Sequence, residues 1–95
     1  MEKTIHSEAH AAFCRILRET REYKEITQTA LARKLGSPQS FIAKVEIGER
    51  RLDVVELLAY AKGLQISPGK LIARLEAEIA GMKPKLAKKR SPKSK

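Results

Sequence analysis

A tight bend between two short amphipathic segments is the feature that most constrains what this chain can fold into. The segments cover residues 28–35 and 37–46, and Gly36 lies between them, where a glycine tolerates the left-handed conformation that ends a helix. Helices joined so closely pack at a steep angle, which requires a small residue at their contact, and Ala32 meets this requirement. Their apolar residues are spaced to point back into one core: Leu31, Leu35, Ile42 and Val45.

Helix-start signals recur along the rest of the chain. Thr27 is expected to cap the helix over 28–35, and Ser37 to cap the next one, with Pro38 at its first position, where a missing N–H costs nothing. The same residue types mark two later helix starts, Asp53 with Glu56 and Ser67 with Pro68. Together with a first helix over 7–23, this pattern predicts an all-α fold of five helices.

The length of 95 residues allows one domain. We expect a flexible segment over residues 1–6, a helical domain over 7–81 and a disordered basic tail over 82–95. The helix that starts after Asp53 is expected to have its apolar side at Leu57, Leu58, Ala61 and Leu64. In the helix that starts at Pro68, Leu71 and Ile72 are expected to complete the core.

The net charge of +9 suggests a polyanionic partner, but most of the excess lies in the tail. From Lys83 onward there are seven basic residues and no acidic one, whereas residues 1–82 carry 13 bases against 11 acids. The tail either solubilises the chain or wraps a nucleic-acid backbone. The total charge therefore does not locate a binding surface.

The outer face of the helix over 38–46 does locate a binding surface. It carries Gln39, Ser40, Ala43 and Lys44 at helical spacing. Such side chains suit base edges in a DNA major groove, because glutamine pairs with adenine, serine with several bases and alanine with a thymine methyl. Gln28 begins the preceding helix, where the helix dipole favours a phosphate. We therefore predict a surface for double-stranded DNA.

Several other functions are not expected. Cys14 is the only cysteine, so neither an internal disulfide nor a cysteine-based zinc site can form. His6 and His10 have metal-ligand spacing but no third ligand, so no metal site is expected. The chain shows no catalytic pattern, membrane span or secretory signal. We expect a cytoplasmic protein without enzymatic activity, cofactor, membrane contact or small-molecule ligand.

Residues 17–72 resemble the Cro/C1-type (XRE-type) helix-turn-helix family. The resemblance rests on spaced motifs: TQ at 27–28, LAxKLG at 31–36, QS at 39–40, IxKxE at 42–46 and GERR at 48–51. It implies a compact five-helix, lambda-repressor-like DNA-binding domain, with the helix-turn-helix motif at 28–47. Such a protein would be a transcriptional regulator.

The resemblance also implies residue roles. Gln39, Ser40, Ala43 and Lys44 would read bases. The DNA backbone would be held by Gln28, Thr27, Ser37, Arg50 and Arg51. Arg21 and Glu46 would form a structural ion pair. The chain departs from the family where Glu25 and Gln65 replace common glycines, and where Pro38 occupies a position that sometimes reads bases.

The helix after Pro68 continues its apolar stripe to Leu75 and Ile79, beyond what one small domain needs. Family members commonly pair at this end, so these residues predict a homodimer on a near-palindromic operator, with recognition helices about 34 Å apart. The leading hypothesis is a repressor. An antitoxin with a toxin as protein partner and a restriction-modification controller remain alternatives, because the three share one fold.

Overall fold

The computed structural model describes residues 3–82, and side chains from residue 8 onward. This part of the chain contains five helices and no strand: α1 (Lys3–Tyr23), α2 (Gln28–Leu35), α3 (Gln39–Glu46), α4 (Val54–Gly63) and α5 (Pro68–Ala80). The predicted all-α, five-helix fold is confirmed. The first helix begins four residues earlier than expected, and the predicted tail from residue 83 onward lies outside the described residues. Within the described part, no helix combines the length and apolar character needed to span a membrane.

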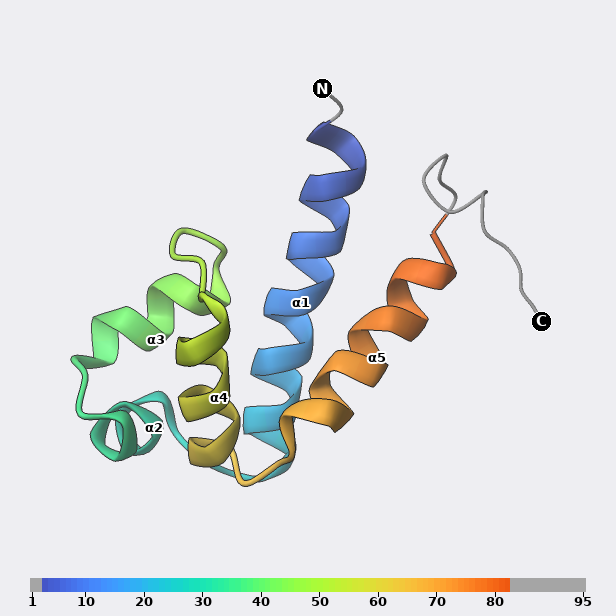
Figure 1. Ribbon diagram of the computed structural model, residues 1–95. Coiled ribbons are helices and arrows are strands. Elements are labelled where there is room, and N and C mark those ends of the chain that lie inside the picture. Colours follow the sequence, from blue (N-terminus) through green and yellow to red (C-terminus); the bar gives the residue numbers. More distant parts are fainter. Residues whose placement is uncertain (1–2, 83–95) are drawn as a thin grey trace.

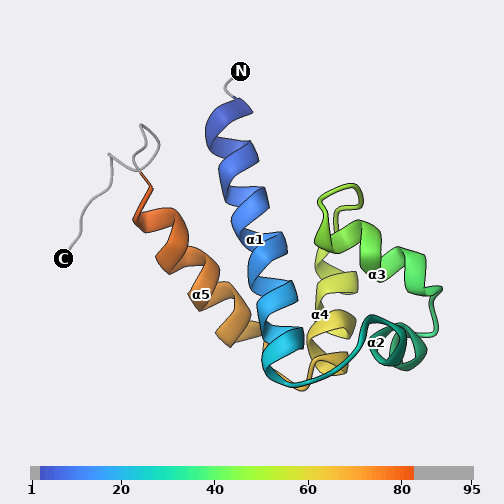
Figure 2. The same cartoon turned by 180° about the vertical axis from the view of Figure 1, so that it is seen from behind.

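α1 and α4 lie at the centre of the bundle, with α2 and α3 on one side and α5 on the other (Figures 1 and 2). α2 packs against α3, and α4 packs against both α2 and α5. α1 contacts α3 on one side and α5 on the other. The two short helices of the bend are thus supported from behind by longer ones, so their outer faces remain open.

One core joins all five helices. The bend contributes the residues predicted from its pattern, Leu31, Ala32, Ile42 and Val45, each at most 3% exposed. Leu35 is only partly buried and packs at the edge of this core. The other helices contribute Ile16, Leu17, Tyr60, Ala61, Leu64 and Leu71. The bend is therefore held by the hydrophobic core of the whole domain rather than by local contacts alone.

The helix ends follow most of the predicted signals. Thr27 accepts a hydrogen bond from the Ala30 backbone N–H at 3.0 Å, and Gly36 closes α2 with φ of 69°. The pair Asp53–Glu56 forms a full capping box. Ser67 caps α5, with proline at the first position. Each signal satisfies backbone groups that would otherwise lack partners at a helix end.

The prediction that Ser37 caps α3 is wrong. Pro38 is the capping residue, and its extended backbone (ψ of 154°) places the first helical residue at Gln39. The Ser37 hydroxyl instead donates to the Pro38 carbonyl at 3.3 Å. Because proline has no side-chain acceptor, α3 begins without a side-chain cap.

Two apolar predictions for α4 and α5 are also wrong. Leu58 is 51% exposed and Ile72 is 38% exposed, although both were expected on the apolar side. Leu75 takes the expected place of Ile72 and packs against the core. Leu71 and Leu75 are one helical turn apart and share a face, whereas Ile72 is rotated about 100° from Leu71.

Backbone conformation explains the departures at Glu25 and Gln65. Both residues have positive φ, 56° and 61°, which side chains with a Cβ seldom adopt. Lys24 connects the two turns, because its ammonium donates to the Gln65 carbonyl at 2.6 Å. The two positions therefore keep the backbone shape that glycine accommodates with less strain.

α4 approaches α2 closely at Gly63. A Cβ built there would lie 2.6 Å from Leu35 Cδ1 and 2.7 Å from Leu31 Cδ1. At such distances the two leucine side chains would have to shift to admit even one methyl group. Nothing in the sequence pattern indicated this contact, because glycine near the end of a helix suggests a terminator first.

Candidate nucleic-acid interface

The exposed face of α3 carries the side chains predicted to read bases. Gln39, Ser40 and Lys44 are exposed, and Ala43 is partly buried. On the opposite face, Ile42 and Val45 are buried in the core. α3 is thus fixed from behind and presents a polar surface of short side chains with one lysine.

A chain of hydrogen bonds runs from this face into the protein. The Gln39 amide nitrogen donates to Gln28 Oε1 at 2.6 Å, and the Gln28 amide nitrogen donates to Glu46 Oε1 at 2.9 Å. Glu46 in turn accepts from Arg21 Nε at 2.6 Å and from its terminal nitrogen at 3.1 Å. The predicted Arg21–Glu46 ion pair is therefore present, and it anchors both glutamines.

These hydrogen bonds leave polar groups of both glutamines available for a ligand. Each amide nitrogen has two N–H groups, of which one is used in these hydrogen bonds, and the side-chain carbonyl oxygen of Gln39 accepts none from the described residues. Gln39 can therefore still donate and accept at once, as pairing with an adenine edge requires. Gln28 keeps one N–H at the amino end of α2.

The Arg21–Glu46 pair, at the inner end of these hydrogen bonds, is buried. The side chains of Arg21 and Glu46 are 11% and 3% exposed, and Arg21 also donates to the Ile26 carbonyl at 2.8 Å. The hydrogen bond to Glu46 raises the pKa of the Arg21 guanidinium. A buried pair with these additional hydrogen bonds has few alternative arrangements, so it fixes the orientation of Gln28.

Tyr60 is a buried residue that sequence reasoning missed. Its side chain is fully buried, and its hydroxyl has no hydrogen-bond partner among the described residues. Burial, together with the charge of Glu46, raises the pKa of Tyr60 beyond its ordinary range. Its ring lies 6.4 Å from the ring of Phe41, so it supports α3 from below.

The loop after α3 separates the two arginines predicted to contact the DNA backbone. Arg50 makes two bonds to the Glu56 carboxylate, at 2.5 and 3.0 Å, and its guanidinium lies 5.0 Å from the centre of the Phe41 ring. The Arg51 side chain is exposed and has no ion pair among the described residues. Arg50 is engaged within the domain, whereas Arg51 is available to a partner.

Thr27 and Ser37 occupy different settings. The Thr27 side chain is exposed, and its hydroxyl oxygen caps α2 beside Gln28. Ser37 is half-buried in the turn between α2 and α3, bonded to the neighbouring carbonyl. The structure thus brings Thr27, Gln28 and Gln39 together at one end of the bend.

The fold and this surface define a helix-turn-helix protein. The family model for helix-turn-helix matches residues 17–71, which is more than half of the chain. The chain belongs to this family, in its Cro/C1 (XRE) type, and is a DNA-binding transcriptional regulator. A comparison with curated proteins finds no match.

Solved structures give particular relatives. An XRE-family like protein from Pseudomonas syringae pv. tomato str. DC3000 is 45% identical, with a TM-score of 0.75, over 80% of this chain and 93% of that one. The restriction-modification controller protein C.AhdI from Aeromonas hydrophila is 34% identical, with a TM-score of 0.62, over 68% and 97%. The wild-type controller protein C.Esp1396I is 27% identical, with a TM-score of 0.69, over 75% and 93%.

Proposed function

We propose that this chain represses transcription by occupying a near-palindromic operator as a homodimer. The observation that carries the proposal is the hydrogen-bond chain from Gln39 through Gln28 to the buried Glu46. It holds a base-pairing amide at the exposed amino end of α3 before DNA arrives. Holding a side chain in its bound orientation reduces the entropy lost on binding. The protein then acts by occupancy and not by catalysis.

We assign base reading to Gln39, Ser40 and Lys44, with Ala43 as an apolar contact. Gln39 offers adenine a donor and an acceptor, and the Ser40 hydroxyl can pair with several bases. Lys44 lies one turn further along α3 and reaches either a guanine or a phosphate. These contacts choose the sequence that is bound.

We assign the DNA backbone to Gln28, Thr27, Ser37 and Arg51. Gln28 and Thr27 lie at the amino end of α2, where free N–H groups and the helix dipole favour a phosphate. Arg51 adds a cation from the loop after α3. Because Arg50 is bound to Glu56, its role is to hold that loop in place.

The exposed apolar side chains of α4 and α5 suggest the surface that forms the homodimer. Val54 and Leu58 are exposed and one turn apart on α4, and Ile72 is exposed on α5, which packs against α4. Ile79 lies two turns after Ile72 and is partly buried. Leu75, predicted at the interface, is partly used by the monomer core. We therefore place the interface on Leu58, Ile72 and Ile79, with Leu75 at its edge.

Selection of bound sequences from a random pool of double-stranded DNA tests this function. We expect an enriched near-palindrome whose half-sites are centred about one DNA turn apart, since two recognition helices of a two-fold dimer repeat at that spacing. Repression is then tested with a reporter promoter that carries the enriched sequence. A pool without enrichment, or enrichment of a single half-site, would refute the dimeric operator.

A second candidate is a restriction-modification controller, favoured by the similarity to C.AhdI and C.Esp1396I. Such a protein would bind DNA through the same surface, so the structure does not separate the two. The neighbouring open reading frames do: genes for a restriction enzyme and a methyltransferase beside this one would favour the controller. An adjacent toxin gene would instead favour the antitoxin.

A further inference from the structure

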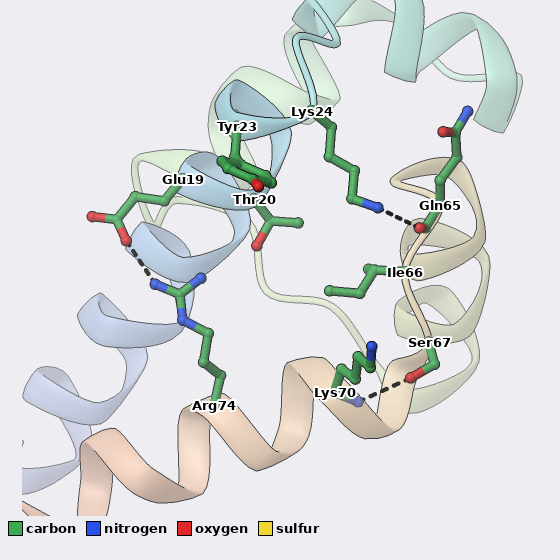
Figure 3. A pocket seen from close by; sticks show the side chains of 9 residues that line it. All are labelled: Glu19, Thr20, Tyr23, Lys24, Gln65, Ile66, Ser67, Lys70 and Arg74. Atoms are coloured by element: carbon green, nitrogen blue, oxygen red, sulfur yellow. Dashed lines mark hydrogen bonds and ion pairs between the residues drawn. The ribbon is translucent and has the colours of Figure 1, made fainter.

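A cavity of about 620 Å³ opens between the end of α1, the loop before α5 and the first turns of α5 (Figure 3). Its size falls within the range of about 300–1,000 Å³ typical of small-molecule sites. The cavity lies on the α5 side of the bundle, and α3 lies on the other side (Figures 1 and 2). It is therefore separate from the surface assigned to base reading.

A buried hydroxyl points into this cavity. Thr20 is only 6% exposed and lines the cavity wall. Figure 3 shows its oxygen directed into the space between α1 and α5. A hydroxyl group both donates and accepts, so a ligand in the cavity can form a hydrogen bond with Thr20 from this side.

Cations outnumber acids in the lining of the cavity, with Lys24, Lys70 and Arg74 against Glu19. Lys70 is exposed, and its ammonium has no ion pair within the described part of the chain. The Lys24 ammonium is held by the Gln65 carbonyl at 2.6 Å, and Arg74 is paired with Glu19 at 2.8 Å. The carboxylate of Glu19 is thus neutralised by its partner. The two lysines remain to attract an anion.

Two further features favour an anion that carries a planar group. The Ser67 hydroxyl accepts from the Lys70 backbone N–H, so its own O–H is available to an acceptor. Tyr23 stands at the rim with 87% of its surface exposed, while Ile66 lines the cavity wall. An exposed tyrosine ring beside an apolar wall offers a stacking face to a flat ligand.

We propose that this cavity binds a small organic phosphate of mononucleotide size. The phosphate accepts hydrogen bonds from the Lys70 ammonium and from the Thr20 and Ser67 hydroxyls. The planar group stacks on Tyr23. This proposal departs from the expectation, drawn from the sequence, that the protein has no small-molecule ligand.

Titration of the isotope-labelled full chain with AMP, followed by amide NMR, tests the proposal. We expect saturable shifts at residues lining the cavity. Thr20→Val and Lys70→Ala should each weaken AMP binding about tenfold or more, as expected for a lost hydrogen bond to a charged group. Lys62→Ala is the matched control, because it removes an exposed lysine of α4 outside this cavity. Amide spectra of each variant verify that the fold is kept.

Four results would overturn the proposal. They are an absence of saturable shifts with AMP, an equal loss in Lys62→Ala, and binding of inorganic phosphate or adenosine as tightly as AMP. The fourth is a loss of DNA affinity in Lys70→Ala without added nucleotide, which would make the cavity part of the DNA interface. The DNA selection described above does not depend on AMP, so the two proposals fail independently.

Discussion

Gln39 and Gln28 are joined side chain to side chain, with the amide nitrogen of Gln39 donating to Gln28 Oε1 at 2.6 Å. The bond connects the first residue of α3 to the first residue of α2, across the bend between the helices. The residue proposed to read a base and the residue proposed to hold a phosphate are therefore positioned as one unit. A substitution at either residue should therefore alter the orientation of the other side chain.

Replacement of Gln39 by Ala should relax the choice of one base pair in each half-site. The preferred base at that position should lose about 1–3 kcal/mol of discrimination, because its bidentate partner is gone. Binding to operators that carry each of the four bases at that position measures the effect. Lys62→Ala is the control, because Lys62 lies on α4, away from α3. An equal loss for all four bases would assign Gln39 to the backbone instead.

The two arginines of the loop after α3 should behave differently. Arg51→Ala should reduce the slope of log affinity against log salt by about 1 per protomer, as for the loss of one phosphate contact. Arg50→Ala should leave this slope unchanged, because Arg50 is bound to Glu56. Affinities measured over a series of salt concentrations provide the test. A smaller slope in Arg50→Ala alone would reverse the two assignments.

The ion pair with Arg50 should also be visible in the titration of Glu56. The hydrogen bond from Arg50, then the Asp53 backbone N–H, hold the pKa of the Glu56 carboxyl below its ordinary value. A depressed folded-state pKa stabilises the fold above the unfolded-state pKa, and this contribution is lost as the pH falls through the folded-state value.

NMR titration of the Glu56 carboxyl provides the measurement for this pair. Arg50→Ala should raise its pKa toward the ordinary value, and Arg51→Ala should leave it where it is, because the guanidinium that bonds to Glu56 belongs to Arg50. An unchanged pKa in Arg50→Ala would mean that the pair does not form in solution.

Glu25→Gly should stabilise the domain. Glu25 has φ of 56°, a conformation that costs a residue with a Cβ about 1–2 kcal/mol, and glycine removes much of this cost. We expect a gain of about 1 kcal/mol, or a rise of about 4–8 °C in the melting temperature. Glu25→Ala keeps the strain and removes the carboxylate, so it is the matched control. Stabilisation by alanine as large as by glycine would identify charge, and not backbone strain, as the cause.

Leu58→Asp and Ile72→Asp should produce monomers that bind the operator far more weakly. Both side chains are exposed, at 51% and 38%, so a charge there disturbs an interface rather than the core. Sedimentation equilibrium measures the mass, and Ala59→Asp supplies the same charge at another exposed position of α4. Unaltered dimers in both variants would place the interface elsewhere.

The sequence predicted those parts of the fold that depend on local chemistry. Thr27, Gly36 and the Asp53–Glu56 pair act within a few residues of themselves, so their roles follow from residue type and spacing. The outward direction of Gln39 followed from helical periodicity. The Arg21–Glu46 pair followed only from resemblance to the family, because residues 25 apart in sequence carry no local signal.

Other features needed the packing of the helices. The start of α3 moved from Pro38 to Gln39 because the proline backbone is extended there. The exposure of Leu58 depends on how the helices pack, which periodicity along one helix does not fix. Arg50 could not be separated from Arg51 until the position of Glu56 was known. The cavity at Thr20 likewise forms only where the carboxyl end of α1 meets the amino end of α5.

The hydrogen-bond chain also bears on how this regulator could acquire new targets. Its buried end, Arg21 with Glu46, belongs to the fold, whereas its outer end at Gln39 lies in solvent. An exchange at position 39 can therefore alter the base that is preferred while the anchor below it stays intact. A substitution of Glu46 would destabilise the fold itself. In this hydrogen-bond chain, Gln28 alone lies between a position that can change to alter specificity, Gln39, and a position that the fold requires, Glu46.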